Sequence, residues 1–266
     1  MGTLYSRNIG TLSAKGKYIF PLDNDDMFLK EDVFSIIFNI ANKDNIDIVE
    51  FKCIETSFDG NNIFNNKIGD TNFAKHKLNT IMRQPELSNY PIRAGKQLGK
   101  YHLYDVYLWG KCIKTKIYQK AVNKLGEERY SRWMTAHEDV IMTFVLFNTI
   151  NTFKFVGKYG IVHIKRKGNA FSQVKEIEKS KKEIYLADVV IDFAKNTEPH
   201  KKLVPYLIIN IFNLKNLEKV LNENEYNRKL LNSCLDRVLN STLISNNYKN
   251  EIRKRGKQLK YIKYPF

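Results

Sequence analysis

"GKYIFPLDNDDMF", residues 16–28, places a run of apolar residues directly before three carboxylates. We expect residues 17–22 to form a short buried strand that ends just before Asp23, Asp25 and Asp26. Carboxylates at the end of a strand can hold Mg²⁺ or Mn²⁺ with the phosphates of a substrate, because open α/β sheets bind ligands beyond the carboxyl ends of their strands. Alternatively, Asp25 or Asp26 simply caps the helix that follows. The cluster alone leaves both interpretations open.

The segments after this cluster predict an α/β domain. Val33, Ile36, Ile37 and Ile40 have the spacing of a helix with one buried face, and "IDIVEFKCIE" at 46–55 reads as the next strand. Strand, helix and strand in this order predict a βαβ unit and a parallel sheet. The further predicted elements are a loop over 58–70, a strand leading into a helix over 104–122, a helix over 137–150 and a strand or hairpin over 152–166. Successive helices are predicted from residue 173 onward.

Composition narrows the class of protein. The 266 residues are 43% hydrophobic and 12% aromatic, which excludes an intrinsically disordered chain. The 44 basic and 28 acidic residues give a net charge of +16, so we expect an anionic partner such as nucleic acid, anionic lipid or a phosphorylated small molecule. Three scattered cysteines without metal-ligand spacing indicate reduced thiols. Because the sequence shows no signal-peptide pattern after Met1, we expect a cytoplasmic protein.

Four short motifs carry a resemblance to a known family. "YSRNIGTLSAKGKYIFPLDNDDMF" at 5–28 resembles the middle of the family 2 glycosyltransferases of the GT-A fold, including their Asp-x-Asp-Asp (DXD) motif. "LWGKCIKTKIY" at 108–118 is similar to the Trp-x-Lys stretch of that family, and "HEDV" at 137–140 to its Glu-Asp helix start. "VHIKRKGNAFS" at 162–172 resembles the strand and loop that close the catalytic domain. The motifs occur in the order of the family.

The resemblance implies a domain organisation. Residues 1–172 would form a partial GT-A, Rossmann-like catalytic domain with a mixed sheet and flanking helices, and residues 173–266 a helical region with a basic tail. Members of the family open with a strand, helix and strand unit that carries the nucleotide pocket, and the likeness starts after that unit. We therefore expect this chain to lack it, which bears on whether the chain is active alone.

The resemblance also implies a reaction, which is inverting transfer from a nucleotide-sugar to an acceptor hydroxyl. Asp23 and Asp25 would hold Mn²⁺ or Mg²⁺ against the diphosphate of a UDP- or GDP-sugar. Asp139, with Glu138 beside it, would take the proton from the acceptor. Without the other motifs, that acidic pair would be ordinary residues that favour the dipole of a helix start.

The remaining candidate residues follow from the same likeness. Arg7 and Asn8 would bind the donor, and His163 would be a further metal or phosphate ligand. Trp109 would stack on the acceptor sugar with Lys111 near a phosphate. A tryptophan or histidine on a strand is more often an ordinary packed residue, so each of these roles has a structural alternative.

Two other functions remain as alternatives. A degenerate, non-catalytic glycosyltransferase-like module would bind a glycan or a partner chain. A basic nucleic-acid-binding protein ranks last, because the sequence has no helix-turn-helix, RRM or zinc-finger signature. The acceptor would be a glycan, a protein or a lipid-linked molecule. The tail over 249–266 would give peripheral contact with anionic lipid, or else form a solvated basic face, and an uncovered sheet edge near residues 5–22 predicts a homo-oligomer.

Overall fold

The computed structural model describes residues 2–59, 62–68, 78–84, 86–89, 92–93, 104–105, 107–130 and 138–165. It also describes single helical residues further on, which are Leu186, Val189, Val190, Phe193, Glu225, Lys229, Ser233, Asp236, Asn240, Asn246, Lys249 and Asn250.

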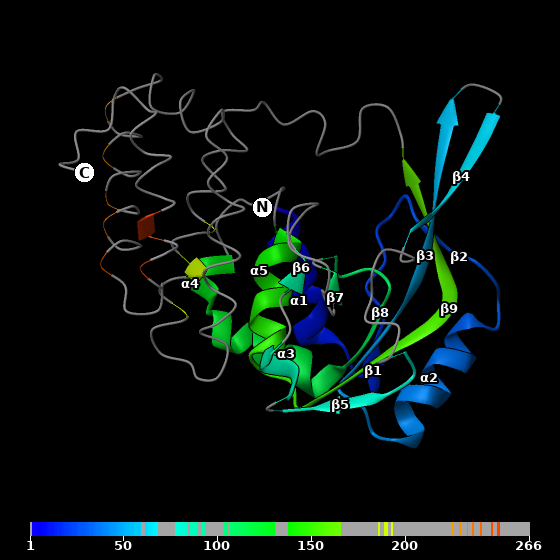
Figure 1. Ribbon diagram of the computed structural model, residues 1–266, viewed down its shortest axis with the longest axis horizontal. Helices are drawn as coiled ribbons and strands as arrows, with labels where there is room; N and C mark the ends of the chain where they lie inside the picture. The colour runs from blue at the N-terminus through cyan, green and yellow to red at the C-terminus, as the bar shows by residue number, and fades with distance from the viewer. Residues whose placement is uncertain are drawn as a thin grey trace.

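A mixed, strongly curved sheet forms the centre of the described part (Figure 1). Its strands are β1 (Tyr18–Ile19), β8 (Lys111–Lys114), β3 (Ile48–Asp59), β9 (Thr152–Lys165) and β2 (Met27–Phe28), in that order across the sheet. β4 (Asn62–Ile68) pairs with β3, and β5 (Ile81–Arg83) pairs with β9. Among the described strands of this sheet, β3 and β9 are the only parallel neighbours. A separate parallel pair is formed by β6 (Ile92–Arg93) and β7 (Tyr104–Asp105).

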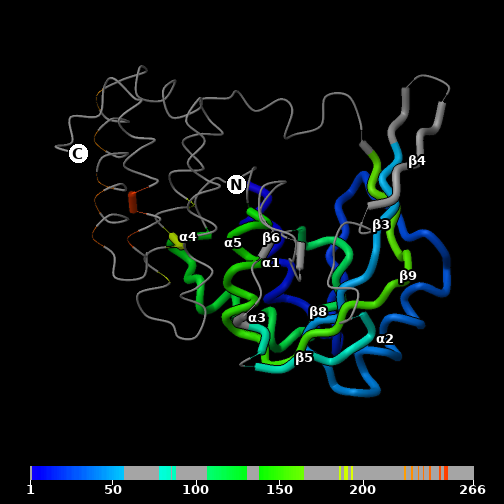
Figure 2. The backbone as a smooth tube through the Cα atoms, in the orientation of Figure 1, coloured from blue at the N-terminus to red at the C-terminus, as the bar shows by residue number. Residues whose placement is uncertain are grey.

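Helices cover both faces of the sheet (Figure 1). α2 (Val33–Lys43) lies on one face, while α1 (Thr3–Ser13), α3 (Thr115–Leu125) and α5 (Glu138–Phe147) pack together on the other. The short elements η2 (Glu86–Asn89) and α4 (Glu127–Tyr130) complete the described set. In the tube of Figure 2, the blue α1 lies beside the green α5, although about 130 residues separate them in the sequence.

Side chains alternate along the strands, and this alternation gives the sheet its two different faces. Val49, Phe51 and Cys53 of β3 belong to the hydrophobic cluster that α2 closes with Val33 and Ile37. Residues between them on β3 point to the opposite face, because successive side chains of a strand alternate. Burying these apolar side chains in the α2 cluster stabilises the fold by roughly 1.5–3 kcal/mol each.

The predicted βαβ unit has its two strands parallel, as expected, but they are not neighbours in the sheet. β1 and β3 both run antiparallel to β8, so they are parallel to each other with β8 between them. β8 comes more than fifty residues later in the chain than β3, and a local strand, helix and strand pattern carries no information about such an insertion. The predicted buried strand over 17–22 is reduced to Tyr18–Ile19, both half-buried.

Two further predictions need correction. The segment 58–70 was predicted to be a loop, but β3 continues to Asp59 and pairs with β4, with Asp59 opposite Asn62. The Gly-Asn dipeptide that separates the two strands is a hairpin signal rather than a loop signal. The segment 152–166 is one long strand, β9, and not a hairpin, because β3 pairs along one side of it and β5 and β2 along the other.

β9 carries an irregularity that sets the position of its second half. The pairing register with β3 shifts on both sides of Lys52, around Gly157 and Gly160 of β9. A Cβ atom at Gly160 would lie 2.5 Å from the ring of Phe51, so only glycine fits there without movement of that ring. Bulges re-aim the side chains that follow them, and His163 lies on the part of β9 that follows this irregularity.

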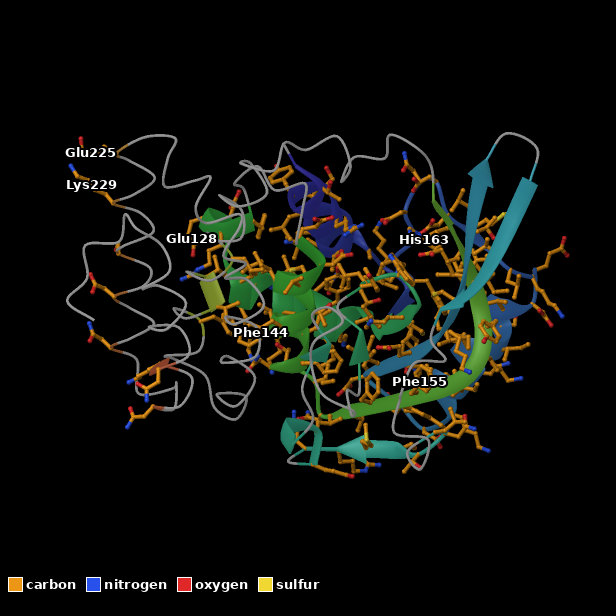
Figure 3. All side chains as sticks on the ribbon, turned by 45° about the horizontal axis from the view of Figure 1, so that its top comes forward. Glu128, Phe144, Phe155, His163, Glu225 and Lys229 are labelled. Atoms are coloured by element: carbon orange, nitrogen blue, oxygen red, sulfur yellow. The ribbon has the colours of Figure 1, made fainter. Side chains whose placement is uncertain are left out.

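The described residues beyond 185 are all helical, in agreement with the predicted helical region. Leu186, Val189, Val190 and Phe193 are buried, and the ring of Phe193 lies 5.8 Å from that of Phe144 on α5. Figure 3 shows Glu225 and Lys229 side by side, where they form an ion pair of 3.0 Å. The boundary at residue 172 stays a prediction, and the basic tail, apart from Lys249, lies outside the described residues.

Candidate functional site

Arg7 joins three carboxylates that come from distant parts of the sequence. Its Nη1 atom donates to Asp139 and, at 3.3 Å, to Glu138, while Nη2 donates to Asp23. Arg7 projects from α1, Asp23 follows β1, and the other two carboxylates begin α5. The packing of α1 against α5 therefore brings two of the four motifs, 5–28 and 137–140, together around one guanidinium.

The electrostatics of this cluster are unusual for surface carboxylates. Burial raises the pKa of Asp139 to about 7, against the opposing effect of Arg7, and the charges of Glu138 and Asp23 raise it further. Burial alone would lower the pKa of Arg7, but the three carboxylates raise it above its ordinary value. Arg7 is therefore always charged, while Asp139 exchanges its proton near neutral pH. A carboxyl group with such a pKa suits general acid–base chemistry.

Asp26 holds His163 in place. The carboxylate of Asp26 contacts Nδ1 of His163 at 2.9 Å and accepts the backbone N–H of Ile164 at 3.0 Å. The hydrogen bond from Asp26 raises the pKa of His163, although burial opposes it. The histidine lies on the upper part of β9 in Figure 3. This contact fixes the ring and leaves Nε2 as the nitrogen that faces away from Asp26.

The interpretation of Asp25 or Asp26 as a helix cap is wrong. α2 begins at Val33, and its N-cap residue is Asp32. β2 lies between the carboxylates and this helix, and Asp26 bonds to β9 instead. The carboxylate cluster therefore does not serve as the start of α2.

Trp109 forms the middle of a stacked column of rings. Its indole lies 5.0 Å from the ring of His163 at 12° and 4.4 Å from that of Tyr107 at 13°. Trp109 itself is only 8% exposed, whereas Tyr107 is 42% exposed. The aromatic surface that the column presents to solvent is thus that of Tyr107, which the sequence reasoning missed. The Tyr-x-Trp spacing, which puts both rings on the same side of an extended segment, was the available signal.

Lys111 and Asn8 both lie in the interior. Lys111 is 1% exposed, pairs with Glu50 at 3.1 Å and donates to the backbone carbonyl of Tyr107. Asn8 is fully buried, and within the described ranges neither polar atom of its amide has a hydrogen-bond partner. In this conformation neither side chain reaches solvent, so the predicted contacts with an acceptor phosphate and with a donor require a rearrangement.

Asp23 and Asp25 are carboxylates of the type that a hard cation prefers, but Asp23 is already engaged by Arg7. Oxygen ligands of Asp23 and Asp25 suit Mn²⁺ or Mg²⁺. Asp25 makes no ion pair or hydrogen bond among the described residues, whereas Asp23 bonds to Arg7. No group of three or more His, Cys, Asp or Glu residues is close enough to hold a metal ion within the part of the chain that the structure describes. His163, the third predicted ligand, faces Asp26 through Nδ1.

Comparison with known proteins supplies relatives for this fold. No protein-family model matches the sequence. Over 196 residues, 68% of this chain, the sequence is 25% identical to a cholesterol galactosyltransferase of Borreliella burgdorferi. The match covers 47% of that protein, so the chain spans about half the length of its relative.

A solved structure has the same fold. The crystal structure of S. aureus TarS 1–349 in complex with UDP-GlcNAc matches with a TM-score of 0.52 and 12% identity, covering 93% of this chain and 63% of that one. The fold is therefore a mixed α/β sheet with flanking helices of the kind found in that protein, as the sequence predicted. The assignment to family 2 stays a prediction.

Proposed function

We propose that this chain transfers a sugar from a nucleotide-sugar donor to an acceptor hydroxyl. The convergence of Asp23 and Asp139 on Arg7 carries the proposal, because it joins the predicted donor-binding carboxylate to the predicted base. The galactosyltransferase relative and the UDP-GlcNAc complex of the structural neighbour support it. The UDP-GlcNAc of the structural neighbour favours a UDP-sugar as donor, with GDP-sugars as the next choice.

The residues of the site suit a single displacement. Asp139 accepts the proton of the acceptor hydroxyl as that oxygen forms its bond to the anomeric carbon. The bond from this carbon to the diphosphate breaks at the same time, and the nucleoside diphosphate leaves with the electron pair. One displacement inverts the anomeric configuration. Because the pKa of Asp139 is raised to about 7, its carboxylate is a stronger base than an ordinary aspartate.

Asp23 and Asp25 would hold a Mn²⁺ or Mg²⁺ ion, with His163 as an additional ligand through Nε2. Such an ion neutralises charge on the leaving diphosphate. The column that ends in Tyr107 offers a flat aromatic surface to the acceptor, which would be a glycan, a protein or a lipid-linked molecule. A sterol is included, because the relative is a cholesterol galactosyltransferase.

A lipid-linked acceptor would place the protein in the cytoplasm at the surface of a membrane. Among the described residues, no helix combines the length and the apolar character that crossing a bilayer requires. The net charge of +16 favours contact with anionic lipid, each basic residue near the surface contributing about 1 kcal/mol.

Donor binding tests the proposal. Calorimetric titration of the chain with UDP-galactose, UDP-GlcNAc and GDP-mannose in the presence of Mn²⁺ should show binding of at least one donor. Asp23→Asn should weaken that binding about tenfold or more, because it removes a carboxylate from the site. Asp44→Asn is the matched control, since Asp44 pairs with Lys154 at 3.7 Å at the end of α2 and not with the cluster. Equal donor affinity in all three proteins, or no binding of any donor, would contradict the proposal.

A non-catalytic, glycan-binding module is the second candidate. The contact of Arg7 with both Asp23 and Asp139 favours it, because Arg7 occupies one oxygen of each carboxylate that a metal ion or an acceptor hydroxyl would otherwise contact. In that case donors or glycans would bind without release of a nucleoside diphosphate. Measurement of UDP release beside donor affinity therefore separates the two candidates.

A further inference from the structure

We infer that Lys111 is a positioning residue that holds the backbone of Tyr107 and thereby fixes the exposed aromatic ring on which the acceptor stacks. The ammonium group of Lys111 is itself held by Glu50. The inference rests on the proposed function for the acceptor as ligand, and it assigns to Lys111 a role different from the phosphate contact that the resemblance implies. The ligand is a pyranose ring, because its C–H groups suit the negative face of an aromatic ring.

Lys111 and Glu50 face each other across two neighbouring strands. They are directly paired residues of the antiparallel strands β8 and β3, and Nζ of Lys111 lies 3.1 Å from Oε2 of Glu50. The side chain of Lys111 is 1% exposed and that of Glu50 is 7% exposed, so water does not screen the pair. A lysine stem is flexible, and a carboxylate fixed on a strand of the sheet therefore sets where the ammonium lies.

The same ammonium donates a hydrogen bond to the backbone carbonyl of Tyr107. Tyr107 lies outside the helices and strands, four residues before Lys111, so this contact joins an irregular segment to the sheet. The ring of Tyr107 stacks on Trp109, and Tyr107 is 42% exposed. Trp109 thus supports one face of the ring while Lys111 holds its backbone, and together they set the direction of the exposed surface.

Lys111 also acts on the surroundings of the predicted base. Its neighbour Cys112 belongs to the hydrophobic cluster under α2, so the alternation of the strand directs Lys111 to the opposite face, where α1, α3 and α5 pack. In agreement, the positive charge of Lys111 lowers the pKa of Asp139 at the start of α5. One buried cation therefore interacts with both the exposed ring and the predicted base.

Stability alone does not explain an ion pair at this position. Neutral or apolar residues of similar size often replace a buried ion pair without loss of stability, because the desolvation of two charges offsets their attraction. Methionine at position 111 with glutamine at position 50 would occupy similar space. It could not donate to the carbonyl of Tyr107, so the pair variant separates the position of the ring from the packing of the sheet.

Near-ultraviolet circular dichroism tests the position of the ring without a ligand. The part of the signal that disappears in Tyr107→Leu is the signal of the aromatic column. The neutral-pair variant, Lys111→Met with Glu50→Gln, should lose most of this signal. Lys114→Met is the matched control and should keep it, because Lys114 lies on the same strand, pairs with Asp47 at 3.5 Å and donates to a backbone carbonyl at 3.3 Å away from the column.

Glycoside binding tests the effect on the ligand. Octyl β-galactoside and octyl β-glucoside, below their micellar concentrations, are titrated into the full chain, and binding is followed by tryptophan fluorescence, since Trp109 is one of two tryptophans. The neutral-pair variant and Tyr107→Leu should each weaken binding roughly tenfold. All three substitutions together should weaken it no more than Tyr107→Leu alone, because Lys111 acts through that ring. Donor affinity should stay unchanged, as should glycoside binding by the Lys114→Met control.

A second variant keeps the test sound if the neutral-pair variant does not fold, which far-ultraviolet circular dichroism establishes. Lys111→Leu with Glu50→Leu makes the pair apolar, and the same results are expected of it. A full column signal in the folded pair variant, or an equal loss in Lys114→Met, would overturn the inference. Effects that add to that of Tyr107→Leu would also overturn it, as would the absence of binding of both glycosides by the wild type.

The result is independent of turnover. If the pair variants weaken glycoside binding through Tyr107 but no protein releases a nucleoside diphosphate, the inference stands and the proposed transfer fails. If the wild type transfers sugar while the pair variants keep both the column signal and the glycoside affinity, the proposed function stands and the pair of Lys111 and Glu50 is only a structural contact.

Discussion

Replacing Asp139 by asparagine removes the predicted base while it keeps the size of the side chain. The amide cannot accept the proton of the acceptor hydroxyl, so turnover should fall by about 10²–10⁴, the usual contribution of a general base. This corresponds to about 3–5 kcal/mol of activation free energy, at about 1.4 kcal/mol for each tenfold change. Donor affinity should stay nearly unchanged, because Asp139 meets the acceptor and not the nucleotide.

The raised pKa of Asp139 predicts how turnover depends on pH. With the pKa of Asp139 raised to about 7, turnover of the wild type should rise with pH and level off above that value. Arg7→Gln removes the charge that lowers this pKa, so the inflection should move to higher pH.

The raised pKa of Asp139 also makes the stability of the fold depend on pH. Because folding raises the pKa of this carboxyl from its ordinary value, its contribution to stability is present below about pH 4 and is lost as the pH rises through about 7.

The assay measures release of the nucleoside diphosphate and formation of product in single turnovers, beside donor affinity from titration. Glu138→Gln is the matched control, because Glu138 is the adjacent carboxylate on α5 and contacts the same Nη1 atom at 3.3 Å. Its turnover should fall by less than about tenfold. Full turnover by Asp139→Asn, or an equal loss in both variants, would refute the assignment of the base.

Three further predictions concern neighbouring residues. Asp47→Ala should lower the free energy of unfolding by about 2–4 kcal/mol in urea, because Asp47 accepts backbone N–H groups at 2.8 and 3.2 Å where β9 begins; a loss below about 0.5 kcal/mol would contradict this. Lys111→Met should lower the free energy of unfolding by about 3–5 kcal/mol in the same measurement, because it leaves Glu50 buried without its cation. Adding Glu50→Gln to the Lys111→Met chain should recover part of this loss. Asp26→Asn should lower the pKa of His163 in an NMR titration of the ring, and an unchanged pKa would show that Asp26 does not set it.

Local sequence patterns predicted those helices and strands whose formation depends mainly on residues close together in the chain. The helix over 137–150 is confirmed as α5, with Glu138 and Asp139 in its first turn as predicted. The helix predicted at the end of the segment 104–122 is confirmed as α3, but the strand before it, β8, is limited to Lys111–Lys114, and Tyr104–Asp105 belong to the separate β6–β7 pair. α3 buries one stripe of side chains, whereas α5 is buried all round from Val140 to Phe147, and in both cases the apolar residues of the segment itself indicate the element.

Contacts between segments far apart in the sequence could not be predicted from local patterns. The insertion of β8 between β1 and β3 depends on pairing over more than fifty residues. The bridge of Arg7 depends on packing between α1 and α5, and the sequence suggested only that its partners belong to one site. The contact of Asp26 with His163 likewise depends on the pairing of β2 with β9 and on the irregularity in β9, which no local signal reveals.

Transfer of a labelled sugar tests the central claim most directly. The full chain is incubated with radiolabelled UDP-galactose or UDP-GlcNAc, Mn²⁺ and a panel of acceptors that includes cholesterol in phospholipid vesicles and soluble glycosides. The account predicts that labelled product and UDP form in equal amounts with the wild type, and that both fall by about 10²–10⁴ with Asp139→Asn. Donor that binds to the wild type but gives neither product nor UDP with any acceptor would contradict the account and identify the chain as a binding module.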